Sequence, residues 1–136
     1  MTAKQYLSQL RKIESRIEIN IEQLERLRSL AEKTTTVFSP CKSYGSNQHP
    51  DKIAEIVCKI IELEDLIAID LGDLLKTKIK IWEAINKVGD ANFRMILLLR
   101  YVECRNWKDI AEEMFYSERW IYQAHGQALQ EIKVEG

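Results

Sequence analysis

The sequence has little of what metal centres and disulfide scaffolds are built from. Its 136 residues include three cysteines and two histidines, and none of them forms a CxxC or similar pair. Neither a zinc site nor a disulfide framework is indicated. An odd, scattered set of cysteines is typical of reduced thiols in the cytoplasm. We therefore expect no metal and no cofactor.

Long apolar runs are equally scarce, and the longest covers only Met95–Leu99. A helix that spans a bilayer needs about 20 apolar residues. No apolar segment follows the opening Met-Thr-Ala-Lys, so we expect no signal peptide. These two absences predict a cytoplasmic protein with no membrane partner.

A strong charge of one sign is absent as well. The chain carries 20 Lys and Arg against 21 Asp and Glu, for a net charge of −1. No global basic field indicates nucleic acid, so any DNA contact has to come from a local patch.

Glycine and proline are missing from residues 2–33, where apolar residues recur at alternating spacings of three and four. This pattern predicts one amphipathic helix over about residues 2–33. A second long helix is predicted over residues 51–88, begun by Asp51 and ended near Gly89. Its apolar stripe comprises Ile53, Ile56, Val57, Ile60, Leu63, Ile67, Leu71, Leu74, Ile81, Ile85 and Val88, with Trp82 on the same seam.

The two long helices predict a coiled-coil hairpin over residues 1–88, with a loop at residues 34–50. Pairing with a second chain, as a homodimer through the N-terminal helices, fits the pattern equally well. The loop is either a functional segment that carries Phe38, Tyr44 and His49 or a simple connector. Along the second predicted helix, acidic residues come first and lysines follow. These charged residues form either a face exposed to solvent or a stripe that contacts DNA phosphates.

Residues 105–132 predict two short helices joined by a tight turn. Asn106 and Ser117 are good N-caps, and Asp109 is the acidic partner in the first turn. The buried positions are expected to be Ile110, Ala111, Met114, Ile121, Ala124, Ala128, Leu129 and Ile132. With a preceding helix that begins near Asp90, this predicts a three-helix helix-turn-helix unit in residues 89–136. In such a unit the last helix lies in the DNA major groove.

The segments LLRY (98–101), WKDIAEEM (107–114), Ser117–Arg119 and Gly126–Leu129 make the similarity more specific. Together they resemble region 4 of bacterial sigma-70-type factors, and more narrowly the small sigma-region-4-like proteins of Gram-positive prophages. The resemblance implies an all-α regulator that binds specific double-stranded DNA. It further implies action with the host RNA polymerase core on late phage genes.

Mapped through this resemblance, the groove-facing positions are Ser117, Glu118, Arg119, Tyr122, Gln123 and Gly126. Arg119 can bond guanine and Gln123 can bond adenine, each through two hydrogen bonds. Ser117 would donate to a phosphate at the helix N-terminus. Arg105, Lys108 and Arg94 are the nearest cations able to neutralise phosphates.

Three features depart from the sigma pattern. Acidic residues outnumber basic ones from Asp90 to Gly136, so we expect this unit to bind DNA weakly without dimerisation or polymerase. Phe115 occupies the turn position that favours Gly, Asn or Asp at positive φ. Trp120 either lies near solvent as a contact residue or folds back onto Tyr116 or onto the helix that begins near Asp90.

Catalysis finds no support in the sequence, which lacks a Gly-rich phosphate loop and a Ser, His, Asp constellation. We expect no enzyme, and we expect His125 on the helix surface as a phosphate neighbour. Two alternatives to DNA-binding regulation stay open. One is a protein-interaction module that mimics or sequesters a sigma–polymerase contact, and the other is a phage DNA-packaging small subunit that would form a large ring.

Overall fold

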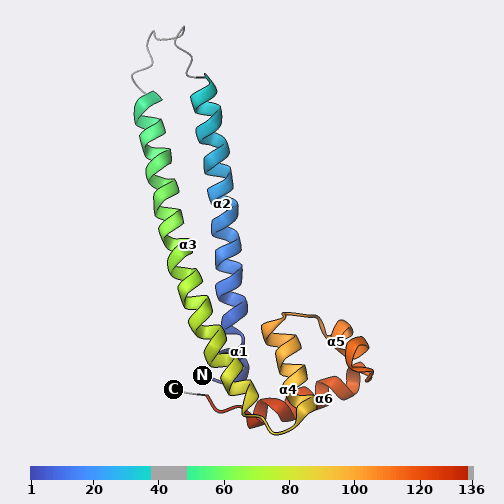
Figure 1. Ribbon diagram of the computed structural model, residues 1–136. Coiled ribbons are helices and arrows are strands. Elements are labelled where there is room, and N and C mark those ends of the chain that lie inside the picture. Colours follow the sequence, from blue (N-terminus) through green and yellow to red (C-terminus); the bar gives the residue numbers. More distant parts are fainter. Residues whose placement is uncertain (38–48, 135–136) are drawn as a thin grey trace. The chain divides into compact units, whose positions relative to one another are not determined.

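The computed structural model describes residues 1–37 and 49–134. Every regular element in these ranges is helical, which confirms the predicted all-α class (Figure 1). The elements are α1 (Ala3–Leu7), α2 (Gln9–Val37), α3 (His49–Asn86), α4 (Ala91–Leu97), the π-helical segment η2 (Leu98–Val102), α5 (Trp107–Met114) and α6 (Glu118–Glu131). The two ends of the predicted loop at residues 34–50 are helical instead, since α2 runs to Val37 and α3 begins at His49. The rest of it, with Phe38 and Tyr44, lies outside the described residues.

The N-terminal helical stretch is interrupted at Ser8, where one continuous helix was predicted. The Ser8 hydroxyl donates to the carbonyl of Lys4 at 2.6 Å, a local bond that competes with the helical pattern. Thr2 and Gln5 begin α1 with a reciprocal capping box. At the other long helix, α3 begins at His49, so Asp51 lies in the first turn rather than at the cap.

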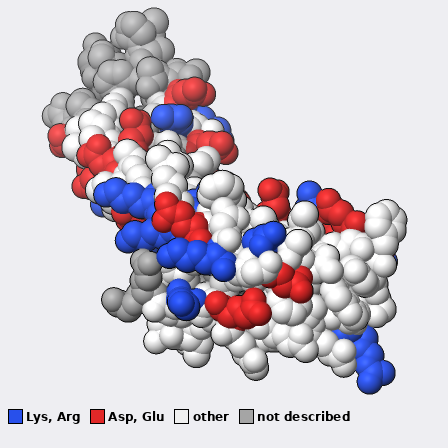
Figure 2. Space-filling view, turned by 60° about the horizontal axis from the view of Figure 1, so that its bottom comes forward, with Lys and Arg blue, Asp and Glu red and all other residues white. Residues whose placement is uncertain are grey.

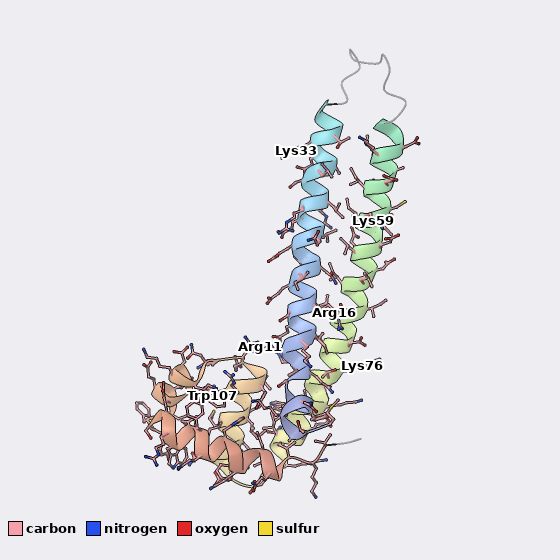
Figure 3. The ribbon with its side chains drawn as sticks, turned by 180° about the vertical axis from the view of Figure 1, so that it is seen from behind. Arg11, Arg16, Lys33, Lys59, Lys76 and Trp107 are labelled. Carbon is pink, nitrogen blue, oxygen red and sulfur yellow. The ribbon has the colours of Figure 1, made fainter. Side chains whose placement is uncertain are left out.

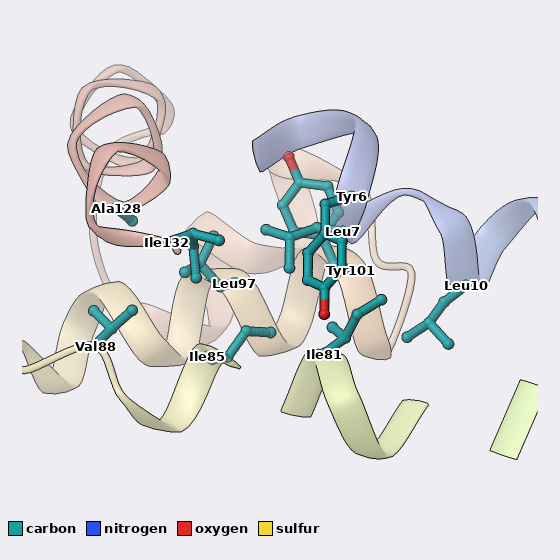
Figure 4. Close-up of a cluster of buried hydrophobic side chains, with 10 residues drawn as sticks. All are labelled: Tyr6, Leu7, Leu10, Ile81, Ile85, Val88, Leu97, Tyr101, Ala128 and Ile132. Carbon is teal, nitrogen blue, oxygen red and sulfur yellow. The ribbon is translucent and has the colours of Figure 1, made fainter. Parts of the chain in front are cut away.

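Packing divides the chain into two units. The core unit comprises Met1–Glu14 and Asp73–Gly136, and the arm unit comprises Ser15–Gly72. This division differs from the predicted boundary after residue 88, because both termini of the sequence contribute to one hydrophobic cluster (Figure 4). Its buried members are Tyr6, Leu7, Leu10, Ile81, Ile85, Val88, Leu97, Tyr101, Ala128 and Ile132. The helix-turn-helix segment therefore shares its core with α1 and the end of α3.

A second cluster in the core unit fills the space between α4, η2, α5 and α6. Its buried residues are Ile96, Leu99, Ile110, Ala111, Ile121 and Ala124. The chain through α4 and η2 supplies both clusters, since Leu97 and Tyr101 lie in the first and Ile96 and Leu99 in the second. This segment thus joins the two halves of the core.

In the arm unit, α2 and α3 run side by side in opposite directions (Figures 1 and 3). Ile17 and Leu24 are buried between them. Arg16 binds the buried Asp70 through two hydrogen bonds, Nε to Oδ2 at 3.0 Å and Nη2 to Oδ1 at 2.9 Å. These bonds hold the pKa of the Asp70 carboxyl below its ordinary value.

Three residues assigned to the apolar seam of the second helix are largely exposed instead. Val57 is 43% exposed, Leu71 50% and Trp82 53%. Their placement on the seam was wrong because α3 is apolar on more than one side. Periodicity alone does not show which side is covered.

Candidate nucleic-acid interface

Helix α5 is positioned by its cap and by its apolar face. The Asn106 side chain accepts from the backbone N–H of Asp109 at 2.8 Å, which confirms the predicted cap. Ile110 and Ala111 are buried, and Met114 packs against the same cluster. Lys108 stays exposed at the start of the helix. The polar side of α5 is therefore available to a ligand.

The turn between α5 and α6 has the left-handed residue that was expected at Phe115. Its φ is 61° and its ψ is 36°, and its N–H donates to the carbonyl of Ala111. Its side chain is 92% exposed, so no packing compensates for the backbone conformation. A non-glycine residue held there costs about 1–2 kcal/mol. Phe115 is thus both strained and exposed.

Helix α6 has one buried face and one open face. Ser117 caps it by accepting from the N–H of Trp120 at 3.1 Å. The buried face carries Ile121, Ala124, His125 and Ala128. The predicted contact residues Ser117, Glu118, Arg119, Tyr122, Gln123 and Gly126 are all exposed, and so are Gln127 and Gln130. The structure therefore brings the predicted contact residues of α6 to its outer side.

Gly126 lies in the middle of this open face. A Cβ built on Gly126 would meet no atom within 4 Å. The fold therefore gives no steric reason for a glycine that costs a helix about 1 kcal/mol relative to alanine. Its absent side chain leaves the α6 backbone accessible.

Two of the predicted phosphate-binding cations have partners within the core unit. The Arg94 guanidinium donates from Nη1 to the carbonyls of Val88 and Gly89, at 2.7 and 3.1 Å. It satisfies two carbonyls of the segment that follows α3, which is a structural role. Arg105 forms an ion pair with Glu113. Lys108 and Arg119 are the predicted cations whose positive charge stays most open.

His125 is buried, which corrects its expected place on the helix surface. It is 8% exposed, and its Nε2 shares a 2.7 Å hydrogen bond with the hydroxyl of Tyr101. The Trp107 ring meets its ring edge-on, with centroids 4.6 Å apart. Burial, with help from the charges of Lys4 and Arg100, lowers the pKa of His125 to about 4. His125 is therefore a neutral structural residue behind the open face.

Arg100 and Trp107 support α6 in a way that the sequence did not suggest. The Arg100 guanidinium lies 4.4 Å above the Trp107 ring and donates to the carbonyl of Arg105 at 3.0 Å. Trp107 also contacts the ring of Tyr122, with centroids 5.1 Å apart. The signal for this contact in the sequence is an Arg seven residues before a Trp, and it is a weak one. The stack fixes the orientation of Tyr122 on the open face.

Trp120 folds back rather than standing free. Its ring stacks on Tyr116 with centroids 3.8 Å apart and an interplanar angle of 15°. The Tyr116 hydroxyl in turn accepts from the side-chain amide of Asn92 at 3.4 Å. Of the two readings for Trp120, the structure supports the contact with Tyr116.

In the view of Figure 2, basic and acidic side chains of the described residues are interspersed. Among the residues that the structure describes, no group of His, Cys, Asp and Glu could hold a metal ion. Within the same residues, no helix has the length and apolar character needed to cross a membrane.

Comparison of the chain with family models, with curated proteins and with solved structures finds no match. The geometry of α5 and α6 is therefore the basis for the functional argument.

Proposed function

We propose that the chain is a DNA-binding transcription regulator whose helix α6 reads base edges in the major groove. The observation that carries the proposal is the division of α6 into two faces. Ile121 is 0% exposed, while Arg119, Tyr122 and Gln123 are exposed along the other side. A helix that follows a short turn and offers a polar edge has the form of a recognition helix.

The residue types on the open face suit base recognition. Arg119 has donors that match guanine, and Gln123 has a donor and an acceptor that match adenine. Gly126 allows the α6 backbone to approach the DNA closely. Ser117 and the N-terminus of α6 would bind a phosphate. Arg105 and Arg94 contribute less than was expected, because both already have partners.

The resemblance to sigma region 4 extends this proposal to a phage-type regulator in the cytoplasm that acts with host RNA polymerase on late genes. The scarcity of free cations supports the need for a partner. Specific DNA binding depends strongly on phosphate neutralisation, and acidic residues outnumber basic ones in this segment. A single copy of the chain therefore binds DNA weakly.

Selection of bound sites from random double-stranded DNA tests the proposal. The full-length chain is expected to enrich one motif, and the double variant Arg119→Ala with Gln123→Ala to lose it. Each lost base contact costs about 1–3 kcal/mol. A matched control is Arg26→Ala with Gln23→Ala on α2, which removes the same two residue types, three residues apart, from another exposed surface. The control should enrich the wild-type motif.

Identical motifs from wild type and the α6 variant would overturn the groove-facing assignment. The absence of any motif for wild type, with or without polymerase, would overturn DNA reading itself. Gly126→Ala adds an independent check, because a purely structural helix would gain stability from it. If α6 reads DNA, Gly126→Ala should raise the stability of the chain and lower its affinity for DNA.

The exposed aromatic residue Phe115 favours a second candidate, a protein-interaction module that binds a sigma–polymerase contact without reading DNA. A large apolar side chain held in a strained turn is typical of a contact residue. A gel shift at several salt concentrations separates the two functions. DNA reading predicts a preferred site and a steep fall in affinity with salt, whereas the interaction module predicts neither.

A further inference from the structure

Residues 1–12 carry positive charge that no acidic residue balances. They include Lys4, Arg11 and Lys12 but no Asp or Glu. All three cations are exposed, and none forms an ion pair within the part of the chain that the structure describes. The helix-turn-helix segment has the opposite balance, because acidic residues outnumber basic ones in residues 90–136. The N-terminal segment therefore has the kind of charge that the helix-turn-helix segment lacks.

Packing within the core unit brings this cationic segment to helix α6. Tyr6 and Leu7 of α1 lie in the same buried cluster as Ala128 and Ile132, and the two helices contact each other (Figure 4). Lys4 lies three residues before Leu7, and residues three apart are neighbours on a helix surface. Lys4 is thus at the border of the buried side of α1. This packing holds Lys4 beside the C-terminal half of α6.

The charge of Lys4 reaches the edge of the open face of α6. Burial lowers the pKa of His125, and the charges of Lys4 and Arg100 lower it further. Lys4 is therefore close enough to the His125 ring for its charge to act there. Gly126 follows His125 directly and is exposed on the open face, and so is Tyr122 one turn earlier. Lys4 is thus a cation next to the surface that we assign to DNA.

Arg11, near the start of α2, extends this positive charge toward the start of α5. Burial and the neighbouring Glu14 raise the pKa of the Cys104 thiol, and the charge of Arg11 opposes that shift. Cys104 lies shortly before α5, whose first residue is Trp107. Figure 3 shows Arg11 at the end of α2 that is beside the segment with Trp107. Since Glu14 lies in the same region and offsets part of the charge of Arg11, Lys4 is the stronger cation of the two.

We propose that Lys4 and Arg11 bind DNA phosphates beside the groove in which α6 lies. This inference rests on the proposed function and adds residues from outside the helix-turn-helix segment to its contact surface. Arg94 and Arg105 are less available for this role, because each already has a partner. Phosphate contacts position a protein on DNA but do not select a sequence. Lys4 and Arg11 therefore add affinity for every sequence, while α6 selects among sequences.

Binding of the full-length chain to its selected DNA site at several salt concentrations tests this inference. Each lost phosphate contact reduces the steepness of log affinity against log salt by about 0.9. Lys4→Gln is expected to cause this reduction, and Lys4→Gln with Arg11→Gln a reduction of up to about 1.8. Both variants should bind more weakly and still enrich the wild-type motif. Lys4→Arg keeps the charge and should keep the wild-type salt dependence.

Lys12→Gln is the matched control, because it removes the same charge from the same segment. Lys12 is two residues from both Leu10 and Glu14 on α2, so it points to the opposite side of that helix. It should leave the salt dependence unchanged. If Lys12→Gln reduces the steepness as much as Lys4→Gln, the effect is one of net charge and the inference is wrong.

Failure of this inference can be distinguished from failure of the proposed function. If the double variant binds with wild-type affinity and salt dependence, Lys4 and Arg11 do not contact phosphates, while the assignment of α6 to the groove stands. If wild type enriches no motif, the proposed function is wrong and this inference falls with it. Helical circular dichroism should be the same for all these variants, because every replaced side chain is exposed.

Discussion

The core unit and the arm unit differ sharply in how much of their apolar surface is buried. All eight of the largest fully buried side chains belong to the core unit: Leu7, Leu10, Ile81, Ile85, Ile96, Leu97, Ile110 and Ile121. Among the side chains of the arm unit that the structure describes, the buried apolar ones are Ile17 and Leu24. Two helices cover each other along one side only, whereas several helices can enclose a core. The core unit therefore has the stronger basis for stability, and the arm unit offers surface.

This contrast can be measured because the three tryptophans, Trp82, Trp107 and Trp120, all belong to the core unit. Their fluorescence reports unfolding of that unit, while far-ultraviolet circular dichroism reports helices in both. We expect the circular dichroism of wild type to fall at lower urea than the fluorescence changes. The predictions below alter one unit at a time.

The largest effect is expected for Leu7→Ala. Leu7 is 0% exposed in the cluster that also holds Ala128 and Ile132 of the helix-turn-helix segment. Its truncation should lower the free energy of unfolding by about 2–5 kcal/mol. Urea unfolding followed by tryptophan fluorescence measures this loss. Ile19→Ala, at a 58% exposed site in the arm unit, is the control and should change little. If Leu7→Ala has the same urea midpoint as wild type by fluorescence, α1 does not contribute to the stability of the core unit.

Asp70→Asn should weaken the arm unit by a smaller amount. It removes the charge from a carboxylate that accepts two hydrogen bonds from Arg16. Since the pKa of Asp70 is lowered, its contribution is present above the ordinary carboxyl range and is lost as pH falls below it. The loss should appear in circular dichroism at neutral pH, with the fluorescence midpoint unchanged. Glu64→Gln, which alters the exposed pair with Arg28 at 3.4 Å, should have less effect.

Acid should destabilise the core unit through His125. Its pKa is about 4 in the folded chain against an ordinary 6.5, so the unfolded chain binds the proton more readily. The contribution of neutral His125 is fully present above pH 6.5 and declines as pH falls toward 4. Fluorescence-monitored stability should fall across this window, and His125→Gln should flatten the fall. The control His49→Gln should show the same fall in stability as wild type. If the stability of wild type does not change with pH in this window, the burial of His125 is contradicted.

The smallest effect is expected for Phe115→Gly, and it should be a gain. Glycine adopts the left-handed conformation without strain, and the lost side chain is 92% exposed. The free energy of unfolding should rise by about 1 kcal/mol. Tyr116→Gly is the matched control and should be destabilising, because Tyr116 stacks on Trp120. A clear loss of stability for Phe115→Gly would show that its ring packs within the fold.

Local signals in the sequence were enough to predict the helices near the candidate site. The caps at Asn106 and Ser117, the left-handed turn at Phe115 and the burial of Ile121 are all present. Each depends on neighbours within a few residues of the chain. The roles of Arg94 and His125 were not predictable in this way, because each is decided by groups in other elements.

The sequence by itself determined the all-helical class, where the helices α4, α5 and α6 begin, and which edge of α6 is polar, because capping and periodicity are properties of local chain geometry. Only the tertiary structure decided that α1 completes the core beneath α6. It alone decided that His125 is buried. Apolar side chains on one face of a helix favour burial. Which segment covers them depends on packing between segments far apart in the chain.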